Sequence, residues 1–155
     1  MKLKLIAVGA RVPDWVELGF TDFARRLPRD CRLELIAVAA ADRKNGKGAE
    51  VWREDEADRL LAAAGKDMRL VALDVLGRGL RTEDLADSLR AWRMDGRDVG
   101  LLVGGPDGLS PRCLAAAQLR WSLSPLTLPH ALVRVVVAEQ IYRAWTLMTG
   151  HPYHR

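Results

Sequence analysis

Short runs of apolar residues alternate along this chain with longer stretches in which apolar positions recur every three or four residues. The short runs are typical of buried strands and cover residues 3–8, 33–38, 69–75, 99–103 and 121–124. The longer stretches are typical of amphipathic helices and cover residues 14–27, 50–64, 82–95 and 130–149. This alternation predicts an α/β protein with a mostly parallel sheet and helices on both of its faces.

Capping residues and glycines predict where these elements begin and end. Asp14, followed by Glu17 three residues later, predicts a capping box, and Thr82 is the expected N-cap of the helix over 82–95. Residues 77–79, Gly-Arg-Gly, predict a turn directly after the third strand. A short helix is expected from Ser110, with Pro111 at its first helical position.

Length and composition predict one ordered domain over residues 1–155. Nearly half of the 155 residues are apolar, but no run of 18 apolar residues exists, so we expect no membrane-spanning segment. Cys31 and Cys113 are isolated and are expected to be reduced thiols in a cytoplasmic protein. The net charge of +4 lies entirely within residues 111–155, which hold five arginines, all three histidines and one acid. This segment is therefore expected to meet an anionic partner.

In a parallel sheet, ligands bind beyond the carboxyl ends of the strands, so the loops after Leu73, Val103 and Leu123 are the informative ones. Residues 104–108, Gly-Gly-Pro-Asp-Gly, allow a ligand to approach the backbone closely; a tight structural turn is the alternative. This loop matches neither the dinucleotide fingerprint nor a phosphate loop. Residues 122–130 are small, apolar and broken by two prolines, so this loop is either buried or wrapped around a flat, partly apolar ligand.

Charged residues outside these loops offer further candidates. The loop over 42–48 carries Arg43, Lys44 and Lys47, which either are solvated or contact RNA phosphates. His130 and Arg134 share one face of the last helix, and Glu139 and Arg143 form either a functional pair or a surface ion pair. His151 and His154 have no clustered cysteine or carboxylate nearby, so no metal is expected.

Taken together, these segments resemble a known family. The chain is similar to the bacterial large-subunit ribosomal RNA pseudouridine N3-methyltransferases, the small single-domain members of the SPOUT (trefoil-knotted) methyltransferases. The resemblance extends over essentially the whole chain. It rests on Met1–Gly9, Leu73-Asp74, Val103–Leu109, Leu123–His130, Leu132–Val135, Ala138–Ala144 and Gly150–Arg155.

The resemblance implies a C-terminal trefoil knot and the cofactor S-adenosyl-L-methionine. It also implies a homodimer in which the cofactor of one subunit lies near the tail of the other. The implied substrate is a pseudouridine in a stem-loop of large-subunit ribosomal RNA, met on the assembled ribosome. RNA contacts are then expected from His130, Arg134, Arg43, Lys44 and Lys47. The family's cofactor contacts fall on Leu73, Gly104, Leu123, Ser124, Pro125, Leu126, Thr127 and Leu128.

Pseudouridine N3 holds a proton between two carbonyl groups, so its methylation calls for a base and a cation. His154 is a candidate base, because histidine changes protonation near neutral pH, or else it positions the substrate. Glu139 is the other candidate base, or it orients Arg143. Arg155, Arg143 or Arg134 is expected to stabilise the anion. Tyr153 is expected to stack on the base or donate to a carbonyl.

Two other functions remain open from the residues alone. One is a ribosome-associated RNA-binding factor on the same fold that lacks catalysis; the other is a small-molecule α/β enzyme that binds a nucleotide at the glycine loop. The intact glycine loop and tail disfavour the first, and the lack of a phosphate-loop lysine disfavours the second. The last three residues are expected to contribute chemistry rather than stability, because chain ends usually fray.

Overall fold

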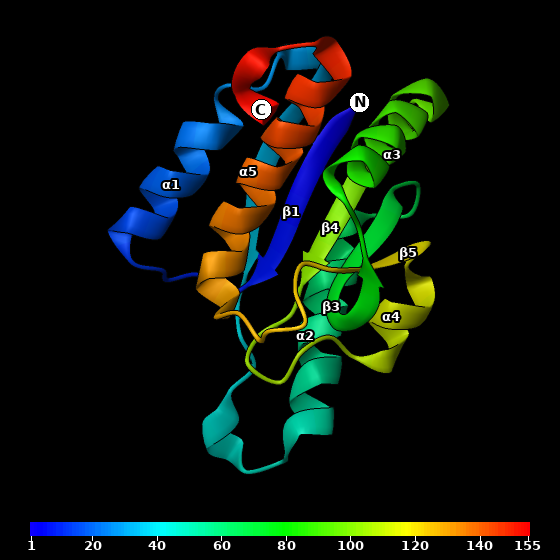
Figure 1. The fold of residues 1–155 in the computed structure, drawn as a ribbon. Coiled ribbons are helices and arrows are strands. Elements are labelled where there is room, and N and C mark those ends of the chain that lie inside the picture. Colours follow the sequence, from blue (N-terminus) through cyan, green and yellow to red (C-terminus); the bar gives the residue numbers. More distant parts are fainter.

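The computed structural model describes all 155 residues, and its strands form one sheet (Figure 1). The order across the sheet is β2-β1-β4-β3-β5, and every neighbouring pair is parallel. All carboxyl ends therefore meet at one edge of the sheet, called here the carboxyl edge. The strands are β1 (Lys2–Val8), β2 (Arg32–Val38), β3 (Arg69–Gly79), β4 (Val99–Val103) and β5 (Leu119–Ser122).

Helices cover both faces of the sheet, which confirms the predicted fold class. One face carries α1 (Asp14–Ala24), α3 (Thr82–Asp95) and α5 (His130–Thr149), and the other carries α2 (Ala49–Ala64) and α4 (Pro111–Ala116). Three single-turn 3₁₀ segments complete the chain. They are η1 (Arg29–Cys31), η2 (Arg43–Asn45) and η3 (Pro152–His154).

The strands divide their side chains between two cores. In β1, Leu3, Leu5 and Ala7 pack toward α1, α3 and α5, whereas Ile6 and Val8 pack toward α2 and α4. Successive side chains of a strand point to opposite faces, and both faces of a parallel sheet are buried. This explains why the strands appear in the sequence as continuous apolar runs rather than as alternating ones.

Helix α5 runs opposite to the strands. It starts at the carboxyl edge, where Arg134 donates a hydrogen bond to the Val8 carbonyl at the end of β1. Its 20 residues rise about 1.5 Å each, so its two ends are about 30 Å apart. The chain then ends in η3, where Tyr153 lies beside Phe23 near the end of α1 (Figure 1). The C-terminal tail, residues 151–155, therefore lies at the end of the molecule away from the carboxyl edge.

Two of the predicted helix caps are wrong. Asp14 and Thr82 are each the first helical residue, and neither caps its helix through its side chain. Pro13 precedes the first helix, and Arg81 precedes the third, where the Asp84 carboxylate accepts the Arg81 N–H at 3.0 Å. In the sequence, an acid inside the first turn that accepts the N-cap backbone N–H cannot be distinguished from a side chain that caps the helix from the N-cap position.

The predicted turn at residues 77–79 is also wrong, because β3 continues through it to Gly79 after a register shift against β5. Gly77 permits this pairing: a Cβ there would lie 2.7 Å from the Arg120 carbonyl carbon. Strand β5 begins two residues earlier than predicted. No helix is long and apolar enough to cross a membrane. The knotted threading of α5 stays a prediction.

Candidate active site

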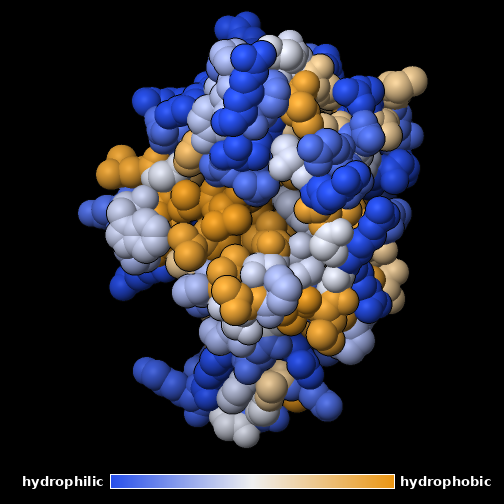
Figure 2. Space-filling model, viewed as in Figure 1, coloured by the Kyte–Doolittle hydropathy of each residue, from blue (hydrophilic) through white to orange (hydrophobic).

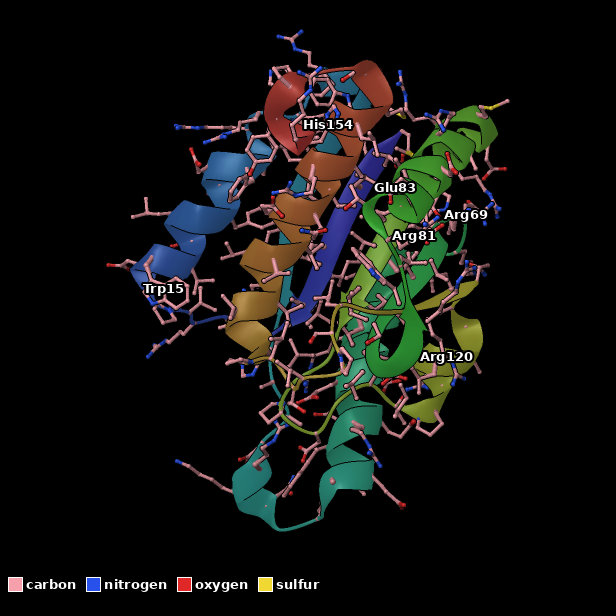
Figure 3. All side chains as sticks on the ribbon, in the orientation of Figure 1. Trp15, Arg69, Arg81, Glu83, Arg120 and His154 are labelled. Atoms are coloured by element: carbon pink, nitrogen blue, oxygen red, sulfur yellow. The ribbon has the colours of Figure 1, made fainter.

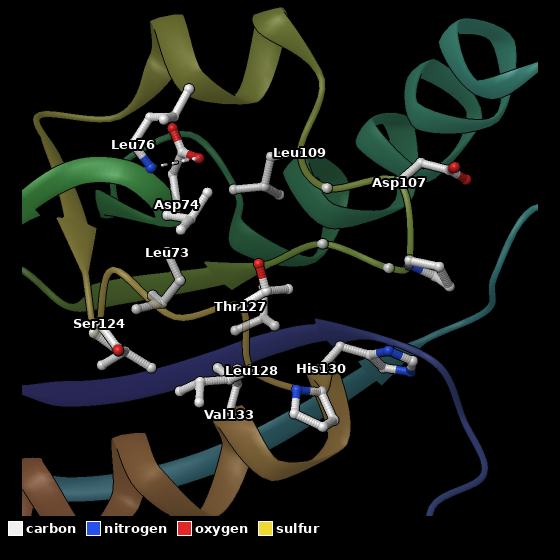
Figure 4. Close-up of a pocket in the computed structure, with 18 of the residues that line it drawn as sticks. Leu73, Asp74, Leu76, Asp107, Leu109, Ser124, Thr127, Leu128, His130 and Val133 are labelled. Atoms are coloured by element: carbon white, nitrogen blue, oxygen red, sulfur yellow. Dashed lines mark hydrogen bonds between the residues drawn. The ribbon is translucent and has the colours of Figure 1, made fainter.

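A cavity of about 650 Å³ opens at the carboxyl edge of the sheet, where ligands of α/β proteins bind (Figure 4). Three loops wall it: the end of β3, the glycine loop after β4 and the loop between β5 and α5. The first turns of α5 close it through His130 and Val133. The volume lies within the usual range for a small-molecule site.

Most of the predicted cofactor residues line this one cavity. They come from three separate parts of the chain, and the parallel sheet brings them to a single edge. Pro125 is the exception, because it turns the loop without lining the cavity. The lining members are Leu73, Gly104, Leu123, Ser124, Leu126, Thr127 and Leu128.

Gly104 is required by the glycine loop itself. A Cβ at Gly104 would lie 2.5 Å from the Gly108 carbonyl carbon, so the two ends of the loop approach too closely for any side chain. Between them the Gly108 N–H donates to the Gly105 carbonyl at 3.0 Å, and Gly108 has a φ of +78°. The tight-turn alternative is therefore correct for this loop, and the same turn lines the cavity.

Two carboxylates at the cavity were missed as candidates. Asp74 follows Leu73, and its only hydrogen bond accepts the Leu76 N–H at 3.3 Å (Figure 4). Asp107 also lines the cavity but is already paired. Asp74 thus offers a free negative charge beside an otherwise largely apolar surface. Its place directly after the apolar run 70–73, within β3, was the signal in the sequence that pointed to it.

A buried acid on α2 holds the glycine loop in place through an intervening arginine. Glu56 on α2 is 1% exposed, and its Oε1 accepts the Ala41 N–H at 3.1 Å and the Arg43 guanidinium at 2.8 Å. Arg43 also donates to Asp107 through Nε at 3.0 Å and through a terminal nitrogen at 2.8 Å. The hydrogen bond with Glu56, followed by the one with Asp107, raises the pKa of Arg43. Arg43 therefore links the loop over 42–48 to the cavity.

The proposed RNA contacts do not form one surface. Arg134 is 1% exposed, and its guanidinium donates to the carbonyls of Val8 and Gly9, so its assignment as an RNA contact is wrong. Burial lowers its pKa. His130 lines the cavity, and the charge of Arg43 is already paired. Lys44 and Lys47 remain exposed on the loop over 42–48.

Near the middle of α5, two of the predicted catalytic residues, Arg143 and Tyr153, gather around a third, Glu139. Its Oε1 accepts the Tyr153 hydroxyl at 3.1 Å and the Arg143 guanidinium at 2.7 Å. The Arg143 guanidinium also lies 5.2 Å from the Tyr153 ring centroid. Burial, followed by the charge of Glu139, raises the pKa of Tyr153. Glu139, Arg143 and Tyr153 are thus one hydrogen-bonded unit, and the Glu139–Arg143 pair is part of it.

The tail is packed, which corrects the expectation that it contributes little to stability. The ring of Tyr153 lies 4.7 Å from that of Tyr142 and 6.5 Å from that of Phe23. The His151 side chain accepts the Tyr153 N–H at 3.2 Å and caps η3. Removing Tyr153 would therefore expose part of the core between α1 and α5.

His154 and Arg155 remain available for other contacts. The Nδ1 of His154 is buried and has no hydrogen-bond partner, and Arg155 is exposed and forms no ion pair. Figure 3 shows His154 at the end of α5 opposite to the cavity. Along α5, Glu139 and Arg143 lie roughly 14 and 20 Å from His130 at the cavity, so the predicted catalytic residues lie outside the cavity of their own chain.

A cavity at the carboxyl edge of a parallel sheet, walled by a glycine turn and a proline-broken loop, defines an α/β protein with a small-molecule site. The family model described as "Predicted SPOUT methyltransferase" matches residues 1–154. The chain therefore belongs to the SPOUT methyltransferases, which confirms the broader family that the resemblance indicated; the pseudouridine N3 group within it stays a prediction.

Two of the solved structures that are similar to this chain illustrate the likeness. The first, TrmJ from Z. mobilis ZM4, is 19% identical, with a TM-score of 0.51 over 92% of this chain and 70% of that one, and so shares its fold. The second, Lpg2936 from Legionella pneumophila, holds the bound cofactor SAM; it is 13% identical, with a TM-score of 0.48 over 93% of this chain. This chain spans 66% of the length of Lpg2936.

Proposed function

We propose that this protein transfers a methyl group from S-adenosyl-L-methionine to N3 of a pseudouridine in a stem-loop of large-subunit ribosomal RNA. In this proposal, it acts as a homodimer on the assembled ribosome. The observation that carries the proposal is the pairing of a cavity suited to the cofactor with a tail cluster suited to proton removal. Family membership supports methyl transfer, and the C-terminal residues support the particular substrate.

The residues of the cavity fit S-adenosylmethionine. Leu73, Leu109 and Val133 offer apolar surface to a flat adenine ring, while Ser124 and Thr127 offer hydroxyl groups to its ribose. The free carboxylate of Asp74 complements a cation, and this cofactor carries a positive sulfonium and an ammonium group. When bound, the cofactor supplies an electrophilic methyl group on sulfur.

The tail supplies what the acceptor nitrogen lacks. N3 of pseudouridine must lose its proton before or as its bond to the methyl carbon forms, and the resulting negative charge spreads over two carbonyl oxygens. In this proposal the imidazole of His154, a partly exposed residue of the tail, accepts that proton. Arg155 is free to stabilise the anion, whereas Arg143 is held by Glu139 and orients the ring of Tyr153.

In this proposal, the cavity and the tail meet between two chains. Glu139, which accepts the Tyr153 hydroxyl, lies roughly 14 Å along α5 from His130, and none of the predicted catalytic residues lines the cavity of its own subunit. In a two-fold dimer, the tail of each subunit can lie at the cavity of the other. An apolar surface over the first half of α5 and the loop before it offers a contact for such a partner (Figure 2).

Titration calorimetry with S-adenosylmethionine, followed by transfer of a tritiated methyl group to ribosomes that lack the modification, tests the proposal. We expect saturable cofactor binding and one methyl group per ribosome, located at N3 of a pseudouridine by mass spectrometry. Cofactor binding with methylation of a different nucleotide would contradict the substrate. Ribosome binding without cofactor binding or transfer would favour the non-catalytic RNA-binding factor.

A further inference from the structure

Four exposed arginines cluster where α1 ends and β2 begins, beside the tail. They are Arg25, Arg26, Arg29 and Arg32, and we call them the arginine face. Asp22 joins the first two, because one of its oxygens accepts Arg25 at 2.9 Å and the other accepts Arg26 at 2.7 Å. Both guanidinium groups therefore lie within a few ångströms of one carboxylate.

The rest of the face surrounds a shallow hollow of about 410 Å³. Arg25, Arg29 and Arg32 line it, and Phe20 and Leu33 contribute apolar surface. Arg29 has no carboxylate within ion-pair distance, while Arg32 pairs with Glu34 at 3.2 Å with its side chain 66% exposed. Asp30, the third acid nearby, is paired with Arg93. The four guanidinium groups of the arginine face thus have two carboxylate partners, Asp22 and Glu34, which leaves an excess of two positive charges.

The face is continuous with the catalytic tail. The Arg26 guanidinium lies 5.2 Å from the Phe23 ring centroid and 5.6 Å from that of Tyr142. Tyr142 in turn lies 4.7 Å from Tyr153, and the charge of Arg26 acts on the Tyr153 hydroxyl. RNA lying along the arginine face would therefore pass directly by Tyr153 and His154.

We propose that the arginine face binds the phosphates of the substrate RNA, on the same subunit that supplies the catalytic tail. Guanidinium groups form paired hydrogen bonds with phosphate oxygens, and such contacts position RNA without reading its sequence. One subunit of the dimer thus holds the RNA, and its partner holds the methyl donor. This inference rests on the proposed function for the identity of the RNA. The loop with Lys44 and Lys47, at the other end of the molecule, is the competing surface.

Binding of three variants to ribosomes that lack the modification, measured by co-sedimentation between 50 and 200 mM salt, tests this proposal. Arg25→Ala/Arg29→Ala should weaken binding roughly tenfold or more and lower the slope of log affinity against log salt by about two. Arg120→Ala is the matched control, because Arg120 is exposed, without an ion pair, and distant from the tail (Figure 3). It should bind within about twofold of wild type. Lys44→Ala/Lys47→Ala tests the competing surface.

Cofactor affinity and melting temperature should be unchanged in all three variants. Wild-type affinity and salt slope in Arg25→Ala/Arg29→Ala would overturn the proposal, and a loss confined to Lys44→Ala/Lys47→Ala would place the RNA on the other surface. The binding assay does not depend on methyl transfer. If the proposed function is wrong, wild-type protein would bind ribosomes but transfer no methyl group, and this result is distinct from a failure of the arginine face.

Mixed dimers test the assignment to one subunit. When His154→Ala and Arg25→Ala/Arg29→Ala are on the same chain and the partner is wild type, one site keeps both its tail and its arginines. Its KM for ribosomes should be that of wild type. When the substitutions are on opposite chains, the only working tail lacks its arginines, and KM should rise roughly tenfold with kcat unchanged. Equal KM values in the two arrangements would contradict the assignment.

Discussion

The first turns of α5 and its second half present contrasting kinds of site. At its first turns lies a cavity lined mainly by loops and apolar side chains, with one free carboxylate in Asp74. From its middle onward lies a polar cluster on a packed aromatic base, in which Tyr153, Arg143 and Glu139 are bound to one another. The first can hold a cofactor but offers few groups for proton transfer; the second has those groups and no cavity of comparable size. In the proposed function the two sites complement each other, because one holds the methyl donor and the other supplies the groups for proton transfer.

The largest effect should come from the tail, without any effect on the cavity. His154→Ala is expected to lower kcat by about 100-fold or more, the usual contribution of a positioned base, with cofactor affinity and stability unchanged. His151→Asn is the matched control, because asparagine keeps an acceptor for the Tyr153 N–H. Single-turnover methyl transfer measures both variants. Full activity in His154→Ala would remove it from the chemistry.

Arg43→Ala should act on the cavity end alone. It leaves the Glu56 carboxylate buried without its partner, which costs about 1–3 kcal/mol of unfolding free energy. It also frees Asp107, so cofactor binding should weaken. Chemical denaturation and calorimetry measure the two effects. In Arg43→Ala/Glu56→Gln, most of the stability should return because no buried charge remains, while cofactor affinity stays low. Wild-type cofactor affinity in Arg43→Ala would show that cofactor binding does not require the contacts of Arg43 with the glycine loop.

Asp74→Asn tests whether the negative charge in the cavity contributes to cofactor binding. Removing the charge while keeping the shape should raise the Kd for S-adenosylmethionine roughly tenfold, the scale of one charge-assisted contact. Asp87→Asn, an exposed acid on α3, is the control and should bind as wild type. Calorimetry measures the affinity of both variants for the cofactor. Equal affinities would mean that Asp74 does not contact the cofactor.

Tyr153→Phe should have the smallest effect, on stability. Loss of the hydrogen bond to Glu139 is expected to cost about 1 kcal/mol at neutral pH. Burial raises the pKa of Tyr153, so the folded state favours the protonated phenol. The stability gained is therefore present below pH ~10 and lost as pH rises through the folded-state pKa. Urea denaturation from pH 7 to 11 should show a smaller alkaline loss in Tyr153→Phe; equal slopes would contradict this.

The fold was largely predictable because its signals are local. The apolar run over 99–103 and the helix over 130–149 match β4 and α5 residue for residue. The resemblance supplied the cofactor residues, and the loops that carry them were predictable because a parallel sheet brings its carboxyl ends together. The predictions that failed concern residues whose partners lie far away in the sequence. Gly77 continues a strand only because the Arg120 backbone passes beside it, and Arg43 is held by Asp107, 64 residues away.

The environment of the tail was not predictable for the same reason. Nothing in the last residues indicates that Tyr153 packs against Tyr142 and Phe23, contacts that the ends of α1 and α5 create. Arg134 likewise has the spacing of a surface residue beside His130, but α5 packs that side of the helix onto the end of β1. Helical periodicity predicts which residues share a face, whereas only the tertiary structure determines which face is buried.

Complementation between two inactive chains tests the central claim, that cavity and tail act between subunits. Thr127→Trp places a large side chain on the exposed wall of the cavity and should abolish cofactor binding; His154→Ala removes the base. Each homodimer should be inactive. Co-refolded in equal amounts, half of the dimers are mixed and hold one intact site, so activity should return to about a quarter of wild type. A mixture that forms mixed dimers and stays inactive would contradict a site shared between two chains.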